Sequence, residues 1–180
     1  GLVVRIAAYE RRANELPISR VTRQVYSPAG RLTQQIDPRL LALAQAGETV
    51  PPNQSISAYS LSGNALATFG VDEGWHVNLS GEAGQPLSLW DSNGSHHRIE
   101  YDALMRPSRA FEQSRDAHER CRERLVYAGN SIEDSHFNRC AQLIRHDDDC
   151  GSVFVPAYNL SGLALEQTRQ FLAQLQPPAW

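Results

Sequence analysis

Hydrophobic and polar positions alternate along much of the chain. Val21 and Val25 lead into a short polar turn, and Leu32 and Ile36 lead out of it. A period of two in segments rich in β-branched and aromatic residues is typical of strands. The same pattern surrounds later turns, for example in residues 65–69. We therefore predict a mostly β fold of consecutive antiparallel hairpins that form a curved sheet, with one or two short helices.

A short turn motif recurs between these segments. It consists of an aromatic or polar residue, three residues of turn type and then a glycine, which supplies the positive φ that ends the turn. Several spacings between copies are close to multiples of 10 or 11, which predicts a continuous ribbon of strands and turns. The copies are Tyr26–Gly30, Tyr59–Gly63, Ser80–Gly84, Trp90–Gly94, Asp147–Gly151, Tyr158–Gly162 and, with Met in place of the glycine, Tyr101–Met105.

One stretch departs from the period of two. Asp37 can cap a helix, Pro38 suits its first turn and Gly47 suits its end, so we predict a helix over 38–46. With the Pro51-Pro52 linker it forms an insertion over 38–52 in a single segment spanning 1–180. Residues 112–120 and 129–139 are polar and turn-prone, and we predict long connections with room for a helical turn in each, the second near 131–138.

Several stretches together resemble a known family. "RVTRQVYSPAGRLTQQIDPRL" (20–40) and "YDALMRP" (101–107) resemble RHS, or YD, repeats. "ERLVYAGNSIEDSHFNRCAQLIRHDDDCG" (123–151), "YNLSGLALEQTRQFL" (158–172) and the terminal Trp180 extend the resemblance. The similarity is to the N-terminal shell region of the C component of bacterial insecticidal toxin complexes (Tc toxins), and it runs from Leu2 onward in family order.

The resemblance implies a structural role. In that family the hairpins spiral into a hollow shell, closed together with a separate B component, around a C-terminal toxic cargo. It implies the B component and the rest of the shell as partners, and export as part of a toxin complex, although no signal peptide is visible. The family's self-cleaving aspartates lie close to the toxin junction, and this sequence carries neither them nor a cargo. The chain begins at Gly1 without a Met, so we expect a piece of a larger shell.

The residues that we expect to matter are therefore structural, and we predict no catalytic residue, cofactor or metal ligand. They are the residues of the repeated turns: Tyr26, Gly30, Arg31, Tyr59, Gly63, Gly84, Trp90, Gly94, Tyr101, Asp102, Arg106, Gly151, Tyr158 and Gly162.

Composition and charge argue against several classes of function. Of the 180 residues, 41% are hydrophobic and 21% are charged, as in ordinary folded domains. The net charge of -3 argues against a nucleic-acid partner. All 17 basic residues are arginines, which excludes chemistry that needs a lysine, such as a Schiff base. The chain has no apolar run of the roughly 18 residues that a membrane helix needs.

Three groups of residues suggest a site, and each has a plainer interpretation. His96 and His97 are adjacent, and adjacent strand residues point to opposite faces, which is poor geometry for joint metal ligation. "HDDDCG" (146–151) lacks the alternating ligands and closing Glu of a calcium loop, so we predict an acidic turn. Three widely spaced cysteines make no disulfide framework or zinc motif, so we expect buried or half-exposed free thiols: Cys121, Cys140 and Cys150.

The main alternative is a binding module. In that case aromatic residues would be exposed on one face for carbohydrate or a surface partner, whereas in a shell they would be buried at hairpin contacts. The residues concerned are Tyr26, Tyr59, Trp75, Trp90 and Tyr101. Unpaired sheet edges near 86–91 or 163–170 further predict self-association. An enzyme is the third and least supported class.

Overall fold

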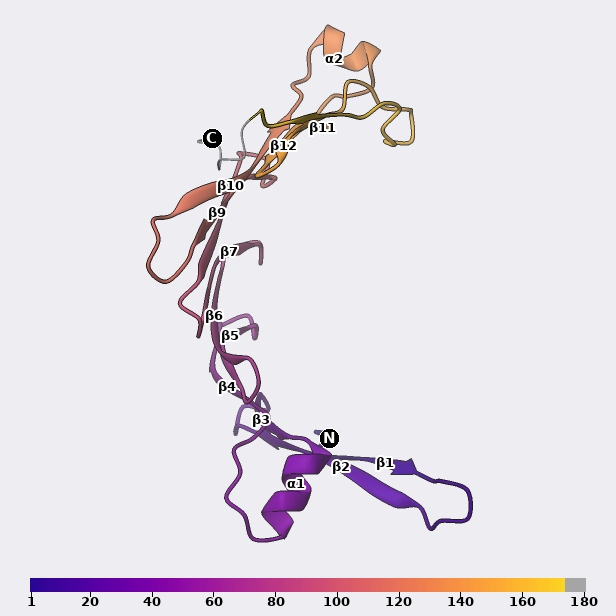
Figure 1. Ribbon diagram of the computed structural model, residues 1–180, viewed down its shortest axis with the longest axis vertical. Coiled ribbons are helices and arrows are strands. Elements are labelled where there is room, and N and C mark those ends of the chain that lie inside the picture. The colour runs from indigo at the N-terminus through magenta and orange to yellow at the C-terminus, as the bar shows by residue number, and fades with distance from the viewer. Residues whose placement is uncertain (174–180) are drawn as a thin grey trace. The chain divides into compact units, whose positions relative to one another are not determined.

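A computed structural model describes residues 1–173, so Trp180 lies outside the described residues (Figure 1). The chain is mostly β, with antiparallel strands joined in succession and two short helices, which confirms the predicted fold class. The strands are β1 (Arg5–Glu10), β2 (Ile18–Tyr26), β3 (Leu32–Ile36), β4 (Gln54–Tyr59), β5 (Ala65–Gly70), β6 (Gly74–Ser80), β7 (Pro86–Asp91), β8 (His96–Tyr101), β9 (Pro107–Gln113), β10 (Arg120–Tyr127), β11 (Leu143–Asp148), β12 (Gly151–Phe154) and β13 (Thr168–Phe171). The helices are α1 (Pro38–Gln45) and α2 (Ile132–His136).

The described residues fall into two compact units. Unit 1 contains residues 1–79 and 89–92, and so β1 to β6 with α1. Unit 2 contains residues 80–88 and those from 93 onward, and so β8 to β13 with α2. In each unit the order of strands in the sheet follows their order in the chain. The proposed continuity of one segment over 1–180 stays a prediction.

Both helices begin at the capping residues that the sequence offers. The Asp37 carboxylate accepts hydrogen bonds from the N–H groups of Arg39 and Leu40 and so caps α1, which packs against β2. Ser131 caps α2 through a reciprocal pair of hydrogen bonds with Asp134. Such caps satisfy the N–H groups that the first helical turn leaves free. In Figure 1, α1 belongs to the β3–β4 connection and α2 to the β10–β11 connection.

Two sequence-based boundaries need correction. The connection predicted over 112–120 is limited to residues 114–119 and has no helical turn, because Glu112 pairs with His97 on one side and Arg120 on the other. The strand over 86–91 is not an edge, since β7 lies inside the strand order. The two terminal strands in that order are β1 and β13, and only β13 overlaps the predicted edge at 163–170.

Little apolar surface is fully buried in this chain. In the described residues, the buried hydrophobic side chains all belong to unit 2: Ala128, Val153, Val155 and Tyr158. A sheet needs a second layer to bury a face. The stability of this fold therefore depends to an unusually large extent on main-chain pairing, turn hydrogen bonds and ion pairs. None of the helices within residues 1–173 has the length and apolar character needed to cross a membrane.

Candidate functional site

Five of the predicted turns have the same hydrogen-bond pattern, and we call them the repeat turns. In the first, the Ser27 N–H donates to the Arg31 carbonyl at 2.8 Å, and the Gly30 N–H donates to the Ser27 carbonyl at 2.9 Å. The other four repeat both bonds at the equivalent positions with distances of 2.8 to 3.1 Å. The repeat turns are residues 26–31, 59–64, 80–85, 101–106 and 158–163.

The fifth position of each repeat turn has a positive φ. Gly30, Gly63, Gly84 and Gly162 have φ values between 76° and 91°, and Met105 takes the same position with φ of 60°. A tight turn followed by a left-handed residue is the hairpin connection that includes a one-residue bulge. The strand registers shift at this point in three of the turns, next to the tyrosine.

The tyrosine that opens a repeat turn fastens it to the preceding hairpin of the same unit. Tyr101 donates its hydroxyl to the Pro86 carbonyl at 2.7 Å, and Pro86 is the residue that follows the previous repeat turn. Tyr59 makes the same contact with the Leu32 carbonyl, directly after the turn at 26–31. Tyr26, Tyr127 and Tyr158 donate in the same way to the carbonyls of Val3, Pro107 and Leu143. The hydroxyls of Tyr59, Tyr101 and Tyr127 therefore each join a strand to the preceding strand of the sheet.

An arginine at the sixth position of a turn extends this contact. The Arg31 guanidinium lies 5.5 Å from the Tyr59 ring centre, and Arg106 lies 4.1 Å from that of Tyr127. Such cation–π contacts stabilise by about 0.5–1 kcal/mol at exposed sites. Arg106 also pairs with Asp102, and hydrogen bonds from Arg106 hold the pKa of that carboxyl below its ordinary value. The motif thus links one turn's arginine to the next turn's tyrosine.

Replacing Tyr101 with Phe should lower the free energy of unfolding by about 1 kcal/mol, because one net hydrogen bond is lost while the ring remains. Tyr9→Phe is the matched control, since Tyr9 is 74% exposed and its hydroxyl makes no hydrogen bond to a described residue. Urea unfolding of both variants measures the difference. Equal losses in Tyr101→Phe and Tyr9→Phe would show that the hydrogen bond of the Tyr101 hydroxyl does not stabilise the fold.

The sequence analysis missed Tyr127 as a member of this set. Its hydroxyl contact and the adjacent register shift match those of the other tyrosines. The motif is hidden because residues 128–142, with α2, replace the short turn, so no glycine follows four residues later. The sequence feature that could have identified Tyr127 is its position as an aromatic residue at the end of an alternating segment.

The two remaining predicted turns differ from the repeat turns. Trp90 is a half-buried residue of β7, and Gly94 has φ of 81° in the β7–β8 connection. Gly151 has φ of 140°, is buried, and is the first residue of β12, directly after the β11–β12 connection. Both turns lie between an odd-numbered strand and the next even-numbered one, whereas the repeat turns follow even-numbered strands.

The acidic stretch at 146–151 is only partly a turn, and this corrects the prediction. Asp147 and Asp148 belong to β11, and the Asp147 side chain is 0% exposed. Its two oxygens accept hydrogen bonds from Arg124 Nε at 2.8 Å and Arg145 Nε at 2.6 Å, and Ser152 Oγ adds a third at 2.5 Å. Burial alone raises the pKa of Asp147, but these three hydrogen bonds outweigh it and hold the pKa below the ordinary value.

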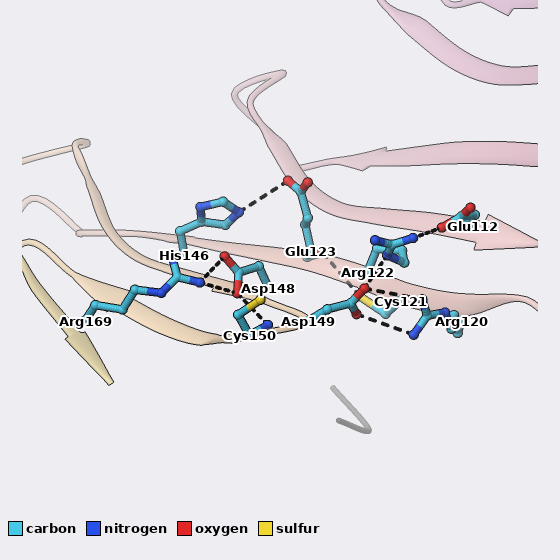
Figure 2. Close-up of polar contacts among 10 residues, drawn as sticks. All are labelled: Glu112, Arg120, Cys121, Arg122, Glu123, His146, Asp148, Asp149, Cys150 and Arg169. Carbon is cyan, nitrogen blue, oxygen red and sulfur yellow. Dashed lines mark hydrogen bonds and ion pairs between the residues drawn. The ribbon is translucent and has the colours of Figure 1, made fainter. Parts of the chain in front are cut away.

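The other charged groups near this strand form ion pairs at the surface (Figure 2). One joins β9 to β10, and the others join β10 or β13 to the end of β11 and its turn. Exposed pairs of this kind contribute about 0–1 kcal/mol each. The pairs are Arg122 with Glu112 and with Asp149, Arg120 with Asp149, Arg169 with Asp148, and His146 with Glu123.

The two adjacent histidines and the three cysteines differ in their burial. His96 is half-buried with Nε2 3.3 Å from Ser88 Oγ, whereas His97 is exposed. Cys121 and Cys140 are half-buried and Cys150 is exposed, which departs from the expected burial for Cys150 alone. Burial raises the pKa of Cys121, which disfavours its thiolate. Residues 1–173 hold no group of three or more His, Cys, Asp or Glu that could bind a metal ion.

His97→Ala should change the free energy of unfolding by about 0.5 kcal/mol or less, because it is an exposed strand residue. Addition of Zn²⁺ or Ca²⁺ to the unmodified chain should leave the melting temperature unchanged. A metal-induced rise that disappears in His97→Ala would contradict the structural interpretation of the two histidines.

Comparison with known proteins relates this chain to bacterial toxin subunits. No protein-family model matches the chain. Toxin subunit YenC1 of Yersinia entomophaga is 30% identical over 164 residues, which cover 89% of this chain and 17% of the relative. Toxin subunit YenC2 of the same organism is 25% identical over 196 residues, which cover 97% and 19%. The chain therefore spans less than a fifth of the length of these relatives.

Solved structures agree over the full chain. The crystal structure of TcdB2-TccC3 matches with a TM-score of 0.90 and 34% identity, over 100% of this chain and 9% of that one. The Photorhabdus luminescens Tc holotoxin pore matches with a TM-score of 0.89 and 34% identity, over 100% and 8%. The chain is thus homologous to the YenC toxin subunits, shares the fold of Tc toxin components, and is an RHS-type region like that of a Tc toxin C component.

Proposed function

We propose that this chain is a non-catalytic wall segment of an RHS shell in a Tc-type toxin C component. The shell would enclose a C-terminal toxic cargo together with a B component, and would be exported as part of the toxin complex. The observation that carries the proposal is the repeated tyrosine contact, in which Tyr59 and Tyr101 each fasten a turn to the preceding hairpin. Such contacts favour an extended wall, because they connect successive hairpins without a separate core.

The side chains of the repeat turns support a structural role. Tyr26, Tyr59, Tyr101 and Tyr158 are buried or half-buried, and their hydroxyls are engaged by main-chain carbonyls. Aromatic residues that bind a ligand need accessible rings and free polar groups. We therefore propose that these residues build the wall, and that any toxic activity belongs to the cargo.

A domain exchange tests the proposal. In YenC1, the region homologous to this chain is replaced by the chain itself, and the chimera is co-expressed with its B protein. We expect a stable complex whose cargo resists a protease that degrades it after denaturation. A matched chimera carrying Tyr59→Ala and Tyr101→Ala should lose protection. Loss of complex formation by the unmodified chimera, or cargo digestion within an intact complex, would contradict the proposal.

One observation favours the alternative of a binding module. Phe69 on β5 and Trp75 on β6 lie opposite each other in register, and each is 44% exposed. A neighbouring pair of accessible rings is suited to stacking on a carbohydrate face. Screening the chain against a glycan array, with Trp75→Ala as the comparison, tests it. Glycan binding that Trp75→Ala abolishes would support this alternative.

A further inference from the structure

The connection between β1 and β2 is an exposed loop that carries two adjacent arginines, Arg11 and Arg12. Every residue at 11–17 is exposed, and Leu16 is 88% exposed. Within this loop the structure describes one main-chain hydrogen bond, from the Glu15 N–H to the Arg12 carbonyl at 3.1 Å. Few contacts therefore hold the loop in a single conformation.

The strands on either side give the loop little support. All of β1 except Glu10 is exposed, and so are the first three residues of β2. The two strands pair in register from Arg5 opposite Arg23 to Glu10 opposite Ile18, and the main chain supplies most of their contact. A hairpin without a buried face is marginally stable in water. Local opening at this end of unit 1 therefore exposes little buried surface, and its free energy is low.

The side chain of Arg12 is accessible to a protein that binds arginine. It is 73% exposed, and its Nε lies 3.6 Å from Glu10 Oε1. An ion pair at such an exposed position is weak, so the guanidinium is easily released. Arg11 adds a second positive charge before it, and the small side chain of Ala13 follows it. Exposed loop tips with small or polar residues are the preferred sites of proteolysis.

The connection between β9 and β10, residues 114–119, is a natural comparison because it is also exposed and carries an arginine. There the arginine side chain packs on a neighbouring turn, since a Cβ atom built on Gly94 would lie 3.0 Å from Arg115 Cβ. Glu119 of the same connection pairs with Arg98 at 2.8 Å. These two contacts hold the β9–β10 loop to its neighbours, in contrast to the β1–β2 loop.

Most of the other arginines are in regular structure. They lie in strands, in α1 or in the repeat turns, where main-chain hydrogen bonds hold the chain. A protease binds its substrate in an extended form, so such residues must unpair before they are cut. The β1–β2 loop is therefore the segment that an arginine-specific protease reaches at the lowest cost.

We propose that the β1–β2 loop is a processing site for an arginine-specific endoprotease, which hydrolyses the peptide bond between Arg12 and Ala13. Such enzymes select a basic residue through an acidic specificity pocket. The bond from the Arg12 carbonyl carbon to the Ala13 nitrogen breaks, and water supplies a hydroxyl to the carbon and a hydrogen to the nitrogen. The new carboxylic acid then transfers its proton to the new amine. This inference goes beyond the shell function, since it concerns the modification of one loop.

The cut should leave the rest of unit 1 folded. β2 pairs with β3 from Arg23 opposite Ile36 to Tyr26 opposite Leu32, and α1 packs on β2. None of these contacts involves the loop. The expected product is therefore a chain with a single cut, in which β2 keeps its place in the sheet.

Limited digestion of the whole chain with trypsin tests the inference. The sequence has no lysine, so trypsin cuts this chain only after arginine. Mass spectrometry of successive samples identifies each product by its first residue. We expect the first product to begin at Ala13. Because cleavage follows the population of the open form, this cut should be at least about tenfold faster than the cut after Arg115.

Two variants separate the site from its local order. Arg11→Gln/Arg12→Gln should stay intact over the time in which the unmodified chain is fully cut, and should unfold at the same urea concentration. Glu119→Gln removes the ion pair that ties the β9–β10 loop to Arg98. It should speed the cut after Arg115 and leave the cut after Arg12 unchanged, which makes it the matched control.

Four results would overturn the proposal. They are a first cut after any arginine other than Arg12, equal rates of cleavage after Arg12 and Arg115, an unchanged rate after Arg115 in Glu119→Gln, and an uncut loop under conditions that fully digest the urea-unfolded chain. None of these readouts depends on cargo or on a B protein, so their failure is distinct from a failure of the shell function.

Discussion

Gly151→Ala is expected to lower the free energy of unfolding by about 3–5 kcal/mol, the largest loss at any glycine of the repeated motif. Gly151 has φ of 140°, a conformation that residues with a side chain rarely adopt. A Cβ atom built there would lie 2.1 Å from the Gln170 carbonyl oxygen. That oxygen belongs to the main chain of β13, so the pairing of β12 with β13 would have to shift.

Gly63→Ala separates the clash from the backbone conformation. Gly63 has φ of 91°, and a Cβ there meets no atom within 4 Å, so only the cost of the left-handed conformation remains, about 1–2 kcal/mol. Urea unfolding measures both losses, and hydrogen exchange locates them. We expect faster exchange of the β12 and β13 amides in Gly151→Ala only. Similar losses in the two variants would show that contact with β13 does not constrain Gly151.

The sequence predicts features that depend on local chemistry. The helix near 38–46 follows from a capping aspartate, a proline and a terminal glycine, and the structure places α1 at Pro38–Gln45. The repeat turns follow from glycines such as Gly30, whose conformation few other residues adopt easily. Where the insertion at 128–142 replaces a turn, that local signal disappears, and Tyr127 is missed.

Features that depend on strand register could not be predicted from the sequence. The environment of Asp147 is formed by Arg124 on one neighbouring strand and Ser152 on the other, and their alignment is known only once the strands are paired. A run of three acidic residues therefore indicated a solvated turn. Likewise, the direct opposition of Arg5 and Arg23 depends on the register of β1 with β2.

Asp147→Asn should lower the free energy of unfolding by about 2–3 kcal/mol at pH 7. Removing one partner from a buried ion pair costs about 3–5 kcal/mol, and the partial exposure of Arg124 and Arg145 reduces this. Asp148→Asn is the control on the same strand. Its side chain is 26% exposed and pairs with Arg169, so its loss should be about 1 kcal/mol or less.

The difference between the unmodified chain and Asp147→Asn should also depend on pH. Because the pKa of Asp147 is lower in the folded than in the unfolded state, the ionised carboxylate stabilises the fold fully above the unfolded value of about 3.9. That contribution is lost as the pH falls below this value and through the folded pKa. Urea unfolding at intervals from pH 7 to pH 2 should therefore show the two proteins converging below about pH 4. Asn cannot ionise, so a gap that stays constant or widens in acid would mean that the Asp147 charge does not stabilise the fold.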